Sequence, residues 1–63
     1  MNNVLYYEIE DNQGNLLKTV KTARDLTLYA DSLTEDQAWD MFVYAVMADN
    51  TVLSVTFDGE ILY

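Results

Sequence analysis

The 63-residue sequence contains no cysteine, no histidine and only three basic residues. Without cysteine, the chain forms no disulfide and no thiolate metal site. Without histidine, it lacks the commonest transition-metal ligand and the usual general base near neutral pH. Its two glycines, Gly14 and Gly59, are far apart in the sequence, so no Gly-rich loop can cradle a phosphate. We therefore expect a protein that is not an enzyme and that uses no metal and no cofactor.

Long apolar runs are also missing. No stretch approaches the 18 consecutive apolar residues of a membrane span, and the N-terminus has neither the basic nor the apolar region of a signal peptide. We expect a single domain over residues 1–63 in the cytoplasm. Because 51% of the residues are hydrophobic, including five tyrosines, a disordered acidic tail is excluded.

The charge is strongly one-sided. Eleven acidic residues face three basic ones, a formal net charge of -8. The three bases, Lys18, Lys21 and Arg24, lie in a neutral first segment, whereas residues 25–63 contain eight acids and no base. Three bases cannot outweigh eleven acids at a phosphate backbone, so we expect no direct binding to nucleic acid. Self-repulsion at -8 opposes folding, which indicates that the charge does not serve stability.

The N-terminal third predicts a β-hairpin. Residues 4–10 are rich in β-formers, with Leu5, Tyr7 and Ile9 expected on one face. Turn-forming residues follow at 11–15, and residues 16–21 fit the return strand. The segment 22–33 is compatible with a strand, a helical turn or an ordered loop; we expect a short helical turn or an irregular link.

The middle of the chain predicts the main helix, over about residues 35–48. Thr34 and Gln37 have the spacing of a capping box, and a broad apolar stripe follows them. Trp39 and Phe42 are expected in the core. Asp36, Gln37, Asp40 and Tyr44 are expected on the opposite side of this helix.

The last segment, residues 51–63, predicts a second hairpin around Asp58-Gly59, a pair that favours a type I′ turn. Leu53, Val55 and Phe57 are expected to face one way. The expected fold is therefore α+β, with about four antiparallel strands in two hairpins and one main helix packed on one face of the sheet.

The acidic residues are the candidate binding groups. Asp36 and Asp40 are one helical turn apart, about 6 Å between Cβ atoms, and like charges at this spacing destabilise a helix. With Tyr44 they would form an acidic and aromatic patch, although a tyrosine at the rim of the core and a solubilising acidic surface are the simpler readings. The predicted partner-binding residues are Asp31, Glu35, Asp36, Asp40 and Tyr44, within a wider field of Asp25, Asp49, Asp58 and Glu60. The second choice is Glu8 and Glu10, about 6.5–7 Å apart on one strand face.

In size, charge, lack of cysteine and histidine, and the pairs Glu8/Glu10 and Asp36/Asp40, the chain resembles the small acidic inhibitors of phages and mobile elements. These include anti-CRISPR proteins and anti-restriction DNA mimics. The resemblance implies a stoichiometric inhibitor, monomeric or homodimeric, that occupies a basic surface of a CRISPR effector subunit or a restriction enzyme.

Two other readings remain open. One is a self-associating accessory protein whose sheet edges, or an uncovered apolar face with Val4, Tyr6, Val52 and Leu62, form a dimer. The other is an acidic immunity protein or antitoxin.

Overall fold

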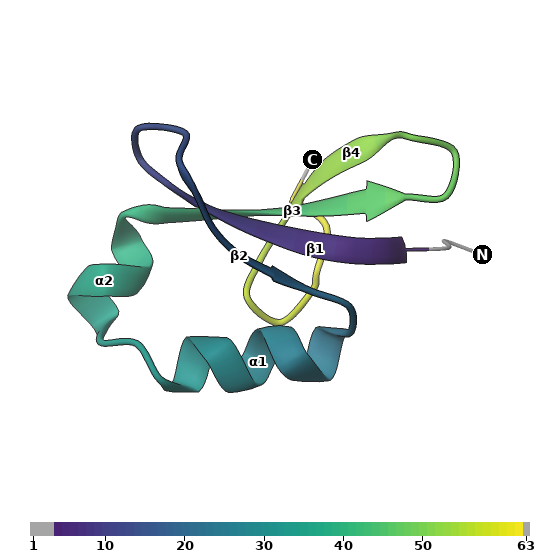
Figure 1. The fold of residues 1–63 in the computed structure, drawn as a ribbon. Helices are drawn as coiled ribbons and strands as arrows, with labels where there is room; N and C mark the ends of the chain where they lie inside the picture. Colours follow the sequence, from purple (N-terminus) through teal and green to yellow (C-terminus); the bar gives the residue numbers. More distant parts are fainter. Residues whose placement is uncertain (1–3, 63) are drawn as a thin grey trace.

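The structure, a computed structural model, describes residues 4–62. It contains a four-stranded antiparallel sheet in the order β2-β1-β3-β4, with two helices on one side of it (Figure 1). The elements in chain order are β1 (Val4–Asp11), β2 (Leu16–Val20), α1 (Ala23–Asp31), α2 (Glu35–Trp39), β3 (Met41–Met47) and β4 (Val52–Val55). The predicted α+β class is therefore confirmed, although the main helix and the second hairpin come from other residues than expected.

The first hairpin, β1–β2, forms as predicted. Its turn is held by Asp11, whose carboxylate Oδ1 accepts hydrogen bonds from the backbone N–H groups of Gln13 (2.8 Å) and Asn15 (2.9 Å). Gly14 has φ +84°, a conformation that glycine adopts without steric cost. Tyr7 and Ile9 are buried as expected, but Leu5 is exposed because the β1–β3 register shifts between Val4 and Tyr6.

The main helix is α1, in the segment for which we expected only a helical turn or a link. Thr22 is the N-cap of α1, and its side-chain Oγ1 accepts a hydrogen bond from the backbone N–H of Asp25 (3.0 Å). Leu26 is the residue of α1 that is fully buried, and the helix packs against β2. Leu26 and Tyr29 of this short helix pack in or against the core, but Leu28 between them is exposed, so the hydrophobic pattern alone did not distinguish a helix from a strand or a loop.

The predicted helix over 35–48 is wrong beyond its first turn. The capping box is present, since Thr34 N–H donates to Gln37 Oε1 (2.9 Å) and Gln37 N–H donates to Thr34 Oγ1 (3.2 Å). After Trp39, however, the chain enters β3, which pairs with β1 on one edge and β4 on the other. An apolar run of valines and aromatics suits a central strand, where both edges supply backbone hydrogen bonds, better than a helix.

The second hairpin is β3–β4, joined through Asn50 at φ +70°. At the predicted Asp58-Gly59 position a tight turn does form, with Gly59 N–H donating to the Thr56 carbonyl (2.9 Å). The chain then returns along β4 through a bridge between Val55 and Ile61. Two backbone hydrogen bonds flank this bridge, from Thr56 N–H to the Glu60 carbonyl and from Leu62 N–H to the Ser54 carbonyl (both 2.8 Å). Within residues 4–62 these contacts form an isolated bridge at the edge of β4 and not a further strand.

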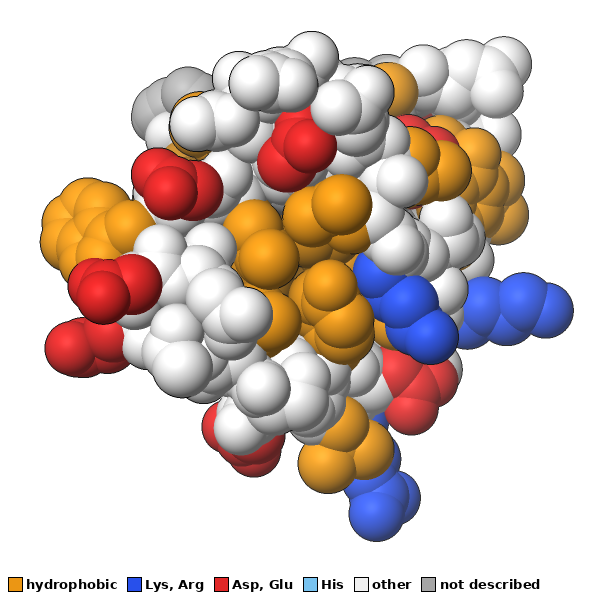
Figure 2. Space-filling model, turned by 60° about the vertical axis from the view of Figure 1, so that its left-hand side comes forward, with side chains coloured by type: hydrophobic (Ala, Val, Ile, Leu, Met, Phe, Trp, Pro, Cys, Tyr) orange, Lys and Arg blue, Asp and Glu red, His pale blue; other side chains and the backbone are white. Residues whose placement is uncertain are grey.

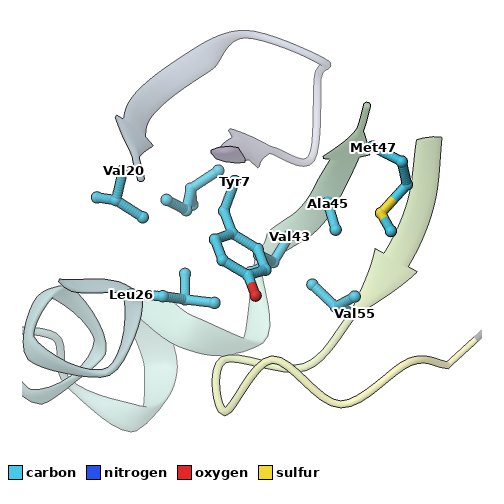
Figure 3. Packing of buried hydrophobic residues seen from close by; sticks show 8 residues of the cluster. Tyr7, Val20, Leu26, Val43, Ala45, Met47 and Val55 are labelled. Carbon is cyan, nitrogen blue, oxygen red and sulfur yellow. The ribbon is translucent and has the colours of Figure 1, made fainter. Parts of the chain in front are cut away.

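The core lies between the sheet and α1. Among the described residues, the buried ones of the core are Tyr7, Ile9, Val20, Leu26, Val43, Ala45, Met47 and Val55. Figure 3 shows Leu26 directed from α1 toward Tyr7 and Val20 of the sheet. The segment around Gly59 approaches the same side, because a Cβ at Gly59 would lie 3.5 Å from both Ala23 Cβ and Tyr7 Oη. The opposite side of the sheet, which we call the open face, is not covered by either helix (Figure 1).

Candidate functional site

The predicted patch of Asp36, Asp40 and Tyr44 on one helix face does not form. Asp36 lies in α2, Asp40 is the residue that ends this helix, and Tyr44 lies in the middle of β3. The cross-strand partners of Tyr44 are Glu8 in β1 and Ser54 in β4. The structure therefore separates Tyr44 from the helix carboxylates and places it next to the second-choice residue Glu8.

The open face carries two neighbouring cross-strand pairs, each of one glutamate and one aromatic residue. Glu8 pairs with Tyr44, and Glu10 pairs with Phe42. Directly opposed residues of antiparallel strands have Cβ atoms about 4.5–5.5 Å apart, so each carboxylate lies beside an aromatic ring. Glu8, Glu10 and Tyr44 are half-buried, whereas Phe42 is 50% exposed and not in the core as expected.

The first-choice acids lie in the two helices or directly after them. Asp31 is the last residue of α1, Glu35 and Asp36 form the first turn of α2, and Asp40 follows its last residue. All four are exposed, and we call them the helix carboxylates.

Two of the helix carboxylates occupy positions where helix electrostatics favour the opposite charge. Asp31 and Asp40 lie at helix C-termini, and neither α1 nor α2 has a basic residue in its last turn. An acid at a helix C-terminus interacts unfavourably with the helix dipole, by about 0.3–1 kcal/mol when exposed. Local stability therefore does not explain these two aspartates.

The predicted position of Trp39 is wrong, and this changes the candidate site. The residue was expected in the core, yet it is 82% exposed, at the end of α2 and between Asp36 and Asp40 in the chain. Tryptophan is enriched among the residues that dominate binding energy at interfaces. Asp36 and Asp40, which flank Trp39 in the sequence, are the feature that argued against its burial.

A groove opens beside Trp39 at the end of the sheet where β3 begins and β4 ends. Its volume is about 440 Å³, and most of its lining is apolar. The lining residues are Glu35, Ala38, Trp39, Met41, Phe42, Val43, Ser54, Val55, Thr56, Phe57 and Leu62. We call it the α2 groove; Glu35 is its charged residue.

The basic residues lie elsewhere. Lys18 and Lys21 line a second groove, of about 500 Å³, between β2 and α1, together with Asp25 and Leu28. Figure 2 shows the blue basic side chains on the right of this face and most of the red acidic side chains on the left and at the top. On this face the basic side chains therefore lie apart from most of the acidic ones.

Two carboxylates outside these clusters have a structural explanation. Hydrogen bonds from the backbone N–H of Asn15 and Gln13 and from the Asn15 side chain lower the pKa of Asp11. Hydrogen bonds from Thr51 lower the pKa of Asp49 in the β3–β4 turn. Both carboxylates stabilise their turns through these hydrogen bonds.

Within residues 4–62, no group of three or more acidic side chains is arranged to hold a metal ion, and no helix is long and apolar enough to cross a membrane. In comparisons with known proteins, no protein-family model, no curated protein and no solved structure matches the chain.

Proposed function

We propose that the protein is a non-catalytic inhibitor that binds a basic, nucleic-acid-binding surface of a host defence complex, in the manner of anti-CRISPR or anti-restriction DNA mimics. The observation that carries the proposal is Trp39, which is 82% exposed in a helix whose charged residues, with its C-cap, are Glu35, Asp36 and Asp40, without any basic residue. An acidic array without interleaved bases fits a basic partner, and an exposed tryptophan fits a partner that covers it.

The spacing of the carboxylates supports this mode of binding. Asp36 and Asp40 are four residues apart, a spacing that corresponds to about 6 Å between Cβ atoms on a helix. Duplex DNA has one phosphate per about 3.4 Å of axis along each strand, and neighbouring phosphates are farther apart than this rise because the backbone winds around the axis. Two carboxylates at this spacing can therefore engage basic groups arranged for neighbouring phosphates. Complementary charge raises the rate of association and selects the orientation, while buried aromatic area supplies much of the affinity.

The test is competition with DNA. The protein is titrated into a CRISPR surveillance complex or a restriction enzyme, and DNA binding is measured at low salt. We expect stoichiometric loss of DNA binding that weakens as salt screens the exposed charges. DNA binding that is unchanged in every complex tested at low salt contradicts the proposal.

Charge reversal locates the surface. Asp36→Lys with Asp40→Lys is compared with Glu8→Lys and Glu10→Lys; each reversal adds two charge units, so both double variants carry -4 instead of -8. We expect the helix pair to weaken inhibition by more than about tenfold, or 1.4 kcal/mol, and the strand pair by much less. Equal effects would show that only net charge matters, and a larger effect of the strand pair would move the site to the open face.

The open face supports a second candidate function, self-association. Phe42 and Val52 are 50% and 55% exposed on this face. Tyr6 is half-buried, and both Tyr6 and Val52 pair with Val46 of β3. Val4, which we expected to need cover, packs against the core of the same chain instead. Two open faces in contact would bring four glutamates together, which opposes a dimer of this kind. Sedimentation at micromolar concentration decides, since a clean monomer contradicts self-association.

A further inference from the structure

We propose that the α2 groove accepts one arginine side chain of the partner, with the guanidinium held between the Trp39 indole and the Glu35 carboxylate. This inference rests on the proposed function for the nature of the partner, a basic surface. It adds the chemistry by which that surface is recognised, and this chemistry can be measured without the partner.

The placement of Glu35 and Trp39 is the first step. The two residues are one helical turn apart in α2, so their side chains share a face of the helix with Cβ atoms about 5–6 Å apart. Both line the groove, and the small side chain of Ala38 lies on the same wall. A carboxylate beside an indole face is the pair that a guanidinium can engage at once, by charge-assisted hydrogen bonds and by cation–π attraction.

The rest of the groove suits the aliphatic stem of the same side chain. Met41, Phe42 and Leu62 contribute apolar lining, and long basic side chains pack their methylene groups along such surfaces. Pockets for drug-sized ligands run from about 300 to 1,000 Å³. The α2 groove, at about 440 Å³, lies within this range and has room for one long basic side chain.

The charges near the groove determine the charge of the side chain that it can bind. Glu35 lines the groove, and Asp36 and Asp40 are adjacent in sequence to lining residues. No basic residue follows Arg24 in the sequence. An apolar occupant would remove water from Glu35 without giving it a partner, which is costly. An acidic occupant would be repelled. A cation compensates the carboxylate and covers the tryptophan together.

Arginine fits this site better than lysine. Its guanidinium is planar, so it can stack on an indole while its N–H groups reach a carboxylate in a bidentate arrangement. It is also more weakly hydrated than an ammonium group, so less free energy is lost when it leaves water. We therefore expect arginine to bind more tightly than lysine, and lysine more tightly than a neutral isostere.

The experiment uses the full chain and three capped tripeptides, Gly-X-Gly with X as arginine, lysine or citrulline, at low salt. Trp39 is the single tryptophan of the chain, so its indole N–H gives one NMR signal that reports directly on the groove. We expect saturable shifts of this signal with the arginine peptide in the millimolar range, and at least about fivefold weaker binding of citrulline, as the loss of a charged contact of about 1 kcal/mol predicts.

Glu35→Gln and Asp36→Asn form a matched pair of variants. Both remove one negative charge from the first turn of α2, but only Glu35 lines the groove. We expect Glu35→Gln to weaken binding of the arginine peptide at least about threefold more than Asp36→Asn. Equal weakening by the two variants, or equal binding of arginine and citrulline, overturns the proposal.

A second copy of the chain is the competing occupant, because Arg24 is a solvent-exposed arginine. Concentration-dependent shifts of the Trp39 signal without peptide, abolished by Arg24→Gln, would show that a second copy fills the groove and would overturn the assignment to the partner. The two proposals fail separately. Loss of DNA competition with intact arginine binding contradicts the inhibitor, whereas inhibition sensitive to Asp36 and Asp40 without arginine binding contradicts the groove.

Discussion

Leu26→Ala tests the packing of α1 on the sheet more sharply than any other single change. Leu26 is 0% exposed and is the fully buried residue of α1, whereas Leu28, on the same helix, is 57% exposed. The two leucines therefore offer the same chemical change in the same helix at opposite degrees of burial.

The expected magnitude follows from burial. Fully buried leucines lose about 2–5 kcal/mol on truncation to alanine, through lost transfer free energy and the cavity left behind. At roughly 0.05–0.15 kcal/mol per residue, a 63-residue domain has a free energy of unfolding of about 3–9 kcal/mol. Leu26→Ala should therefore remove a large part of the total stability. Leu28→Ala should stay within about 0.5 kcal/mol of the wild type, since surface substitutions have little effect.

Urea unfolding followed by far-UV circular dichroism measures both variants. Circular dichroism is preferable to tryptophan fluorescence because Trp39 is already 82% exposed in the folded state. A change in the midpoint at constant slope reports stability alone. If Leu28→Ala lowers the free energy of unfolding as much as Leu26→Ala or more, α1 does not pack on the sheet through the face that carries Leu26.

Three further predictions follow from local structure. Because the pKa of Asp11 is lowered in the folded state, its carboxylate stabilises the fold above the unfolded-state pKa of about 4. This contribution disappears as the pH falls through the lower folded-state pKa. When the urea midpoint is plotted against pH, Asp11→Asn should flatten the curve in this range. Asp31→Lys should raise the free energy of unfolding by about 0.3–1 kcal/mol, because it places a cation at the C-terminus of α1, while DNA competition weakens; a stability that falls instead contradicts the dipole argument. Gly59→Ala should destabilise by about 1–2 kcal/mol, because φ is +85° there, whereas the new Cβ meets its neighbours at an ordinary 3.5 Å; a neutral thermal midpoint would show that the turn can relax.

The candidate site was predictable only in part. The helix carboxylates could be named from the sequence because exposed acids without interleaved bases are visible in the residue order. The groove beside them could not, since its walls come from α2, from the start of β3 and from the end of β4, which meet only in the folded chain. The exposure of Trp39 was missed for the same reason, because an aromatic residue in an apolar run is read as core when the end of the helix is misplaced.

Local structure could be predicted from the sequence where its hydrogen bonds join residues only a few positions apart. The Asp11 turn, the Thr34 capping box and the tight turn at Gly59 all form where the residues predict them, because each donor and acceptor is a near neighbour in the chain. Tertiary structure decided the rest. Met41–Met47 has an apolar pattern that suits helix or strand, and β1 and β4 settle it by pairing with both of its edges. That pairing exposes Trp39 and moves Tyr44 beside Glu8, because side chains alternate along a strand and do not follow the turn of a helix.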